Sequence, residues 1–141
     1  MGITNKQRGG QVLPGLGLWT DVPFDPANFY ASGAMTWVLT PPLVNNRYCR
    51  IGNAIIWNFY AAVTTIGGTP GLNLFLKCPT PMSKYAMGTG LVLNGAPAVT
   101  TIVKGSTGVP GLIGLGLQSN GNFVLGAAQV QFSITYEFGN P

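Results

Sequence analysis

The sequence predicts an all-β protein, a single-domain antiparallel β-sandwich with jelly-roll connectivity. Short segments rich in β-branched and aromatic residues recur along the chain, and Gly, Pro, Asn and Ser separate them. No segment shows an apolar period near 3.6 residues, and 21 Gly and 11 Pro would destabilise long helices. About eight short strands divided by turns are typical of a sandwich, and the jelly roll is the form that we expect.

The chain divides into a short arm and one domain. Residues 1–11 are polar and glycine-rich and show no periodicity, so we expect a flexible N-terminal arm. Residues 12–141 form the predicted β-sandwich domain. A chain of 141 residues is long enough to bury one hydrophobic core.

A predicted β-hairpin over residues 43–63 organises the rest of the domain. Gly52-Asn53 separates LVNNRYCRI from AIIWNFYAAV, and Gly accepts the positive φ of a two-residue primed turn. With this turn, the residues opposite one another are Tyr48 and Trp57, Arg47 and Asn58, and Asn46 and Phe59. The core face of the second strand then carries Ile55, Trp57, Phe59, Ala61 and Val63. The other face carries Ile56, Asn58, Tyr60 and Ala62, which is neither clearly polar nor clearly apolar.

The remaining elements follow from turn residues and alternation. Before the hairpin, residues 21–30 contain two prolines and are predicted as an extended loop, and MTWVL (residues 35–39) is a strand. After it, TTIGGTPG (64–71) is predicted as a loop. Further strands are predicted at LNLFLK (72–77), LVLN (91–94), VTTIVK (99–104) and LIGLGLQ (112–118). Asn120-Gly121 is predicted as a hairpin turn into NFVLG, and QVQFSITYEF (129–138) alternates strictly, as a half-buried antiparallel strand does.

The inventory of reactive side chains argues against an enzyme. The chain has no histidine, which excludes Ser-His-Asp, Cys-His and HExxH sites. Its acids are Asp21, Asp25 and Glu137 alone, and the aspartates are interpreted as solvated loop carboxylates. We therefore expect no catalytic residue, no metal site and no cofactor. Cys49 and Cys78 are expected to be free thiols in a protein made in the cytoplasm, although the sequence leaves a single bridge open.

The charge content points to assembly. Only 7% of the residues are charged, against roughly 25% in ordinary globular proteins. A surface of uncharged polar residues is one explanation; we favour a surface largely covered by copies of the chain or by a larger lattice. The net charge of +4 is spread along the chain without a basic stripe, so no nucleic-acid partner is expected. No apolar run is long enough to span a bilayer, and we expect no membrane association.

Three tyrosines are candidates for a surface role. Most aromatic residues of a β-sandwich belong to its core. Tyr30, Tyr60 and Tyr85 remain for contact with a ligand or with a neighbouring subunit. Few convergent polar groups accompany them in the sequence.

The hairpin and its flanks resemble a module found at the tips of bacteriophage tail fibres and on phage heads. The matching positions of the hairpin and the following strand are Tyr48, Arg50, Ile51, Gly52, Asn53, Trp57, Phe59, Gly68-Thr69, Leu72, Leu74, Leu76 and Pro79. Those upstream are Trp19, Phe24, Phe29 and Met35-Thr36-Trp37. Lys77-Cys78-Pro79 departs from the Leu-Pro that usually closes that strand.

The resemblance implies a trimeric, β-rich virion protein without enzymatic activity. Because the arm is too short to be a fibre shaft, we expect a capsid decoration (cement) protein, made in the host cytoplasm and located on the capsid surface of the virion. It would form a homotrimer, contact the major capsid protein or other virion proteins, and use Lys6 and Arg8 of the arm to bind the shell. The competing expectation is a receptor-binding tip domain of a tail fibre or spike that recognises host-surface glycans.

Overall fold

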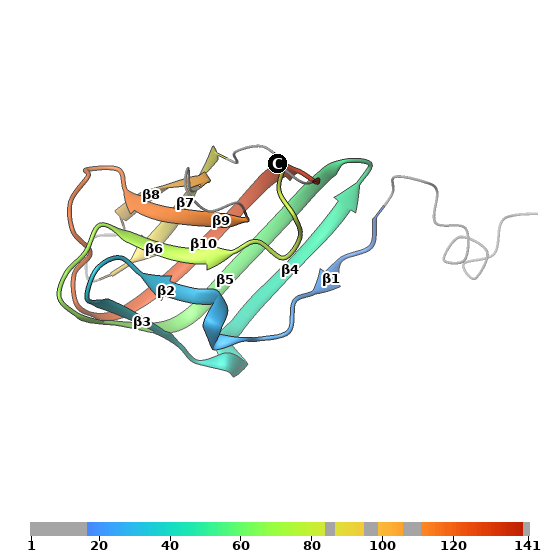
Figure 1. Cartoon of the computed structure of the whole chain (residues 1–141). Coiled ribbons are helices and arrows are strands. Elements are labelled where there is room, and N and C mark those ends of the chain that lie inside the picture. Colours follow the sequence, from blue (N-terminus) through green and yellow to red (C-terminus); the bar gives the residue numbers. More distant parts are fainter. Residues whose placement is uncertain (1–16, 84–86, 95–98, 106–110, 140–141) are drawn as a thin grey trace, which may run out of the picture.

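The structure is a computed structural model that describes residues 17–83, 87–94, 99–105 and 111–139 (Figure 1). The predicted arm over residues 1–11 lies outside this part. The strands of the described part are β1 (Thr20–Asp21), β2 (Phe29–Ala31), β3 (Met35–Leu39), β4 (Val44–Ile51), β5 (Ala54–Gly68), β6 (Asn73–Lys77), β7 (Met87–Leu93), β8 (Val99–Gly105), β9 (Leu112–Leu117) and β10 (Gly126–Glu137). Its helical elements are two 3₁₀ turns, η1 (Pro26–Asn28) and η2 (Pro41–Leu43).

The fold class is confirmed: the chain is nearly all β, with antiparallel pairings, and is sandwich-like. The strands follow the order β1-β4-β5-β10-β7-β8-β9-β6-β2, and β3 joins β5. This continuous sheet curls into a long-strand layer (β3, β4, β5, β10) and a short-strand layer (β2, β6, β9), which lies in front in Figure 1. Strands β7 and β8 connect the layers. The pairing order does not confirm jelly-roll connectivity.

The hairpin of β4 and β5 has the predicted register. Tyr48 lies opposite Trp57, Arg47 opposite Asn58, and Asn46 opposite Phe59. Gly52 has φ +60°, as a primed turn requires. The Arg50 Nε donates a hydrogen bond of 2.8 Å to the Gly52 carbonyl, which fixes the turn further.

Strand β5 is longer than predicted and contains a β-bulge. Ala128 of β10 pairs with Thr64 of β5, and Val130 pairs with Ala61. Between these two pairs, β10 advances by two residues and β5 by three, so the extra residue is in β5. The extra residue reverses the outward-facing positions, so Val63 is 46% exposed. The prediction that Val63 faces the core is therefore wrong, and Thr64 and Ile66 are buried instead.

The second half of β5 pairs with β3, so the prediction of a loop over residues 64–71 is wrong up to Gly68. Met35 lies opposite Gly68 and Leu39 opposite Thr64. On the same edge of β5, β4 pairs with the preceding residues, from Ala54 to Ala61. Strands β3 and β4 thus form one interrupted partner strand. The interruption is η2, whose prolines cannot donate to a ladder, and it lies beside the bulge.

Two other predicted segments differ from the structure. The predicted loop over residues 21–30 contains η1 and the first two residues of β2, besides the end of β1. Asn120 has φ +55°, as a turn residue would, but β9 pairs with β6 and β8, whereas β10 pairs with β5 and β7. The prediction of a hairpin turn at Asn120-Gly121 into NFVLG is therefore wrong.

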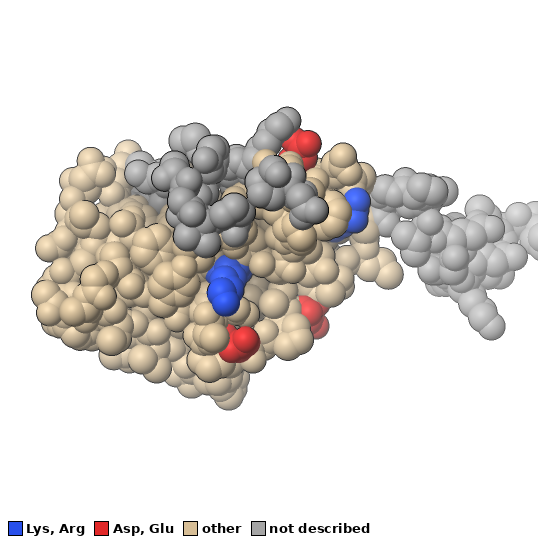
Figure 2. Space-filling model, viewed as in Figure 1, with Lys and Arg blue, Asp and Glu red and all other residues tan. Residues whose placement is uncertain are grey.

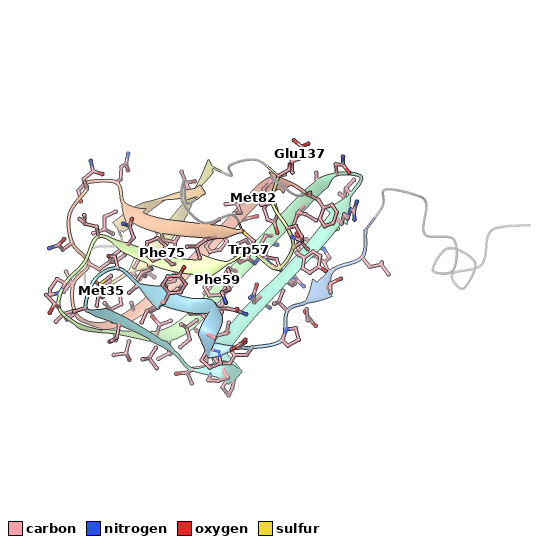
Figure 3. The ribbon with its side chains drawn as sticks, viewed as in Figure 1. Met35, Trp57, Phe59, Phe75, Met82 and Glu137 are labelled. Atoms are coloured by element: carbon pink, nitrogen blue, oxygen red, sulfur yellow. The ribbon has the colours of Figure 1, made fainter. Side chains whose placement is uncertain are left out.

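Aromatic rings join the two layers in the core. The Phe59 ring of β5 lies 5.7 Å from the Phe29 ring of β2 and stacks at 5.3 Å on the Phe132 ring of β10. Trp57 lies two residues from Phe59 on β5 (Figure 3) and is fully buried. Its ring meets the Phe132 ring edge to face, with centroids 5.0 Å apart. Within the described residues, the buried apolar side chains other than Cys49 and Leu112 form one cluster that runs from β2 to β10.

Asn46→Ala should lower the free energy of unfolding by about 1–3 kcal/mol. The indole Nε1 of buried Trp57 donates a 2.7 Å hydrogen bond to the Asn46 Oδ1, and the substitution leaves this donor unpaired. Asn45→Ala, one residue along β4 on the exposed side, is the control, expected to change stability by less than about 0.5 kcal/mol. Urea unfolding of both variants checks the prediction, and equal midpoints would contradict it.

Candidate binding surface

The structure places two of the predicted surface tyrosines and separates them. Tyr30 lies on β2 and Tyr60 on β5, and each is 39% exposed. Their chain neighbours Phe29 and Phe59 contact each other in the core, so the two tyrosines point away from opposite layers. Lys6, Arg8 and Tyr85 lie outside the described residues.

Tyr30 belongs to an aromatic pair on the outer side of the short-strand layer. Its ring stacks on that of Phe75 in β6, with centroids 5.2 Å apart. Phe75 in turn covers Gly114 of β9, where an added Cβ would lie 3.3 Å from the ring. Burial raises the pKa of the Tyr30 hydroxyl above its ordinary value. Phe75 was not predicted as a partner of Tyr30, because the pairing of β2 with β6 is not visible in either segment alone.

Tyr60 lines an open groove on the outer side of the long-strand layer, where β5, β10 and β7 adjoin. The groove has a volume of about 720 Å³. Phe59, Gly90 and Phe132 also line it, and the two phenylalanine side chains belong to the core. The outward-facing side chains that line it are Asn58, Tyr60, Thr89, Leu91, Gln131 and Ser133.

The strand register arranges these side chains in rows across the groove. Tyr60 lies opposite Gln131, and Gln131 lies opposite Leu91. Asn58 lies opposite Ser133 in the neighbouring row, and the Ser133 hydroxyl and the Asn58 Oδ1 form a hydrogen bond of 2.5 Å. Asn58, Gln131 and Ser133 were placed on outward faces by the sequence, but only the pairing of β5 with β10 brings them to Tyr60.

An exposed apolar patch lies beyond the bulge on the same side of β5. Val38 of β3 is 63% exposed and lies opposite Thr65, and Val63 of β5 is 46% exposed. Thr65 lies opposite Ala127 of β10. We call Val38, Val63, Thr65 and Ala127 the valine patch. It has no charged member.

Charged side chains are few and separate on the side shown in Figure 2, where uncharged residues cover most of the surface. Two arginines lie over aromatic rings: the Arg47 guanidinium is 4.8 Å from the Trp19 ring centroid, and that of Arg50 is 3.9 Å from the Phe138 ring centroid. These cation–π contacts hold part of the basic charge against the protein's own surface.

The acids and cysteines are dispersed. Asp25 caps η1, where its Oδ1 accepts a 2.9 Å hydrogen bond from the Ala27 N–H. Across residues 17–83, 87–94, 99–105 and 111–139, no group of three His, Cys, Asp or Glu could hold a metal ion. Cys49 and Cys78 are both free, as expected. Burial raises the pKa of the Cys78 thiol to about 12, so this group is protonated at neutral pH and is a weak nucleophile.

The segment that leads into β1 is held against β4. The Cys49 thiol donates a 3.3 Å hydrogen bond to the Gly17 carbonyl, and the Val22 N–H donates one of 2.8 Å to the Asn46 carbonyl. At Gly17 an added Cβ would lie 1.9 Å from the Arg50 carbonyl oxygen, so only glycine permits this approach. The chain therefore enters the domain along the edge of β4.

Comparisons of the chain with protein-family models, curated proteins and solved structures gave no match. In the described part of the chain, no helix is long and apolar enough to cross a bilayer.

Proposed function

We propose that this chain is a non-enzymatic structural protein of a bacteriophage virion, a capsid decoration or cement protein that binds the head shell as a homotrimer. The residues of the resemblance support it. Gly52, Tyr48 and Trp57, which carry part of the resemblance, are the turn and a facing pair of one hairpin. The assignment to a virion rests on that resemblance.

The observation that carries the assembly role is the valine patch. Val38 and Val63 are more than two-fifths exposed, and no member of the patch is charged. Exposed apolar groups on such a surface favour contact with another protein, since each apolar area removed from water contributes to association. In the trimer, this patch faces a second copy.

The stabilising mechanism is additive burial between neighbouring subunits. A standard protein interface buries about 1,600 Å² in total. A trimer seated on the shell links several capsid subunits, so that these must detach together, and binding to the assembled state alone stabilises it. Lys6 and Arg8 of the arm are the proposed shell contacts.

Deleting residues 1–8 should abolish attachment to the capsid while the domain stays folded, because the deletion ends outside the segment held against β4. Purified particles lacking the protein are incubated with wild-type or truncated chain, and occupancy is measured by gel densitometry and electron microscopy. Circular dichroism of the truncated chain is the folding control. Unchanged occupancy would contradict the role of the arm.

The double substitution Val38→Asp and Val63→Asp should weaken self-association at least about 100-fold, because burial of unpaired carboxylates is costly. Sedimentation equilibrium measures the expected change from trimer to monomer. Leu18→Asp is the control: Leu18 is 72% exposed, and it lies next to β1 rather than on β3 or β5. A monomeric wild-type chain, or a variant that stays trimeric, would contradict the proposed interface.

The groove beside Tyr60 favours a second candidate, a receptor-binding tip domain of a tail fibre or spike that recognises host-surface glycans. The position of the protein on the phage particle distinguishes a cement protein from a tip domain. Labelling the protein on intact phage places a cement protein over the head and a tip domain at the tail. Removal of a cement protein lowers the resistance of the head to heat and leaves adsorption to cells intact, whereas removal of a tip domain abolishes adsorption.

A further inference from the structure

The groove on β5, β10 and β7 has the dimensions of a binding site for a short ligand. Its volume of about 720 Å³ falls within the roughly 300–1,000 Å³ of small-molecule sites. Three strands at their usual spacing span about 10 Å, and the two rows along each strand are about 7 Å apart. The site is built on strands whose register is fixed by a buried face, so the backbone positions and the outward direction of its side chains are fixed.

The groove combines one aromatic face with hydrogen-bonding groups. The Tyr60 ring is 39% exposed and stands at one end of a row, and Leu91 stands at the other end. Between and beside them lie two amides, Asn58 and Gln131, and two hydroxyls, Ser133 and Thr89. Amides and hydroxyls both donate and accept, which is what a ligand rich in hydroxyl groups needs.

Much of this hydrogen-bonding capacity is available to a ligand. The Asn58 Oδ1 accepts the hydrogen bond from the Ser133 hydroxyl, which leaves the Asn58 NH₂ group for another acceptor. Among the described residues, no hydrogen bond occupies the side chains of Gln131 or Thr89. The bond between Ser133 and Asn58 also orients the amide, so that less rotational entropy is lost on binding.

The lack of charged side chains in the groove favours a neutral ligand. No Lys, Arg, Asp or Glu among the described residues lines it, so a phosphate, sulfate or carboxylate ligand would lack a counter-charge there. In the strand register of the described residues, the nearest cation is Arg47, opposite Asn58 on β4, and its guanidinium lies over Trp19. A ligand without polar groups would leave the side-chain amides unpaired, which is unfavourable.

We propose that this groove binds a neutral saccharide, with the apolar face of one pyranose ring on the Tyr60 ring and its hydroxyls bound to Asn58, Gln131 and Ser133. This goes beyond attachment to a capsid, because the groove lies on strands of the domain and the proposed shell contacts lie in the arm. A cement protein with such a groove would also hold the particle on a glycan-coated surface.

The test uses the fluorophore-labelled full chain on an array of neutral hexose and N-acetylhexosamine oligosaccharides, with sialylated and sulfated oligosaccharides beside them. The strongest neutral binder is then titrated by calorimetry into the wild-type chain and four variants. Tyr60→Ala is expected to lose at least tenfold in affinity, and Gln131→Ala about as much; Tyr60→Phe, which keeps the ring, should stay within threefold. Tyr30→Ala is the matched control, since Tyr30 is also 39% exposed but lies on the other layer.

Specific outcomes would overturn the proposal. These are no neutral oligosaccharide bound on the array, charged oligosaccharides bound more strongly than neutral ones, or equal losses in Tyr30→Ala and Tyr60→Ala. Sedimentation of Tyr60→Ala is measured in parallel, and a change of oligomeric state would assign the groove to a subunit interface instead. Capsid occupancy of Tyr60→Ala is expected to equal that of the wild-type chain, so loss of saccharide binding and loss of attachment are distinguished.

Discussion

Replacing Phe59 by alanine should lower the free energy of unfolding by about 3–5 kcal/mol, the largest effect that we expect of any single truncation in the core. Phe59 is 2% exposed and its ring contacts Phe29, Trp37 and Phe132, which come from three other strands. The alanine leaves a cavity where the short-strand layer rests on the long-strand layer. Neither layer can collapse into it without breaking its own strand pairing.

Tyr60→Ala is the control for this substitution. Tyr60 is the next residue of β5, loses a side chain of similar size and points outward, so its effect on stability should stay below about 1 kcal/mol. Chemical denaturation followed by tryptophan fluorescence measures both. If the two variants unfold at the same denaturant concentration, the inward and outward faces of β5 have been assigned incorrectly.

Replacing Gly68 by alanine should cost at least about 2 kcal/mol, because two effects add at this position. Gly68 has φ +76°, a conformation that is unfavourable for residues with a Cβ. An added Cβ would also lie 2.2 Å from the Ala34 carbonyl oxygen, so the end of β5 and the turn before β3 would have to separate. Thermal unfolding followed by circular dichroism measures the loss.

Gly33→Ala isolates the conformational effect. Gly33 has φ +64° but no atom within 4 Å of an added Cβ, so only the backbone strain of about 1–2 kcal/mol remains. The difference between the two variants therefore reports the contact of Gly68 with Ala34. If Gly33→Ala were as destabilising as Gly68→Ala, the close contact between Gly68 and Ala34 would be contradicted.

The features predicted correctly from the sequence are those that depend on neighbouring residues of one segment, such as a turn or the alternation of a strand. Gly52-Asn53 fixed the hairpin register because a two-residue turn leaves no freedom in pairing, and every facing pair derived from it is present. MTWVL coincides with β3, and the alternation of QVQFSITYEF matches the buried and exposed residues of β10. In each case the signal lies within the segment itself.

The features that the sequence did not predict depend on pairing between strands far apart in the chain. The pattern AAVTTIGG contains no mark of a bulge, and Gly67-Gly68 resembles a loop, yet β3 and β10 hold this segment as strand from both edges. Asn120 does adopt a left-handed conformation, but the strands on either side pair elsewhere. The groove depends on the same kind of information, since Tyr60, Gln131 and Leu91 come from three separate strands.

The bulge in β5 divides the outer side of the long-strand layer into two surfaces. Tyr60 and the groove lie before it, and the valine patch lies after it. Because the extra residue increases local twist, the two surfaces need not face the same partner. A trimer contact at the patch is therefore compatible with a saccharide in the groove, and the two can be removed by separate substitutions.

The pairing of β5 with β10 has a consequence for synthesis on the ribosome. Ala54 pairs with Glu137 and Ile66 with Gly126, so one edge of β5 stays unpaired until residues 60 to 83 positions further along the chain have been translated. Until then a nascent chain presents a long, apolar strand with unpaired amides to the crowded cell. A polypeptide halted before Gly126 would keep that edge bare, and we expect it to enter inclusion bodies even though β4 and β5 can still pair.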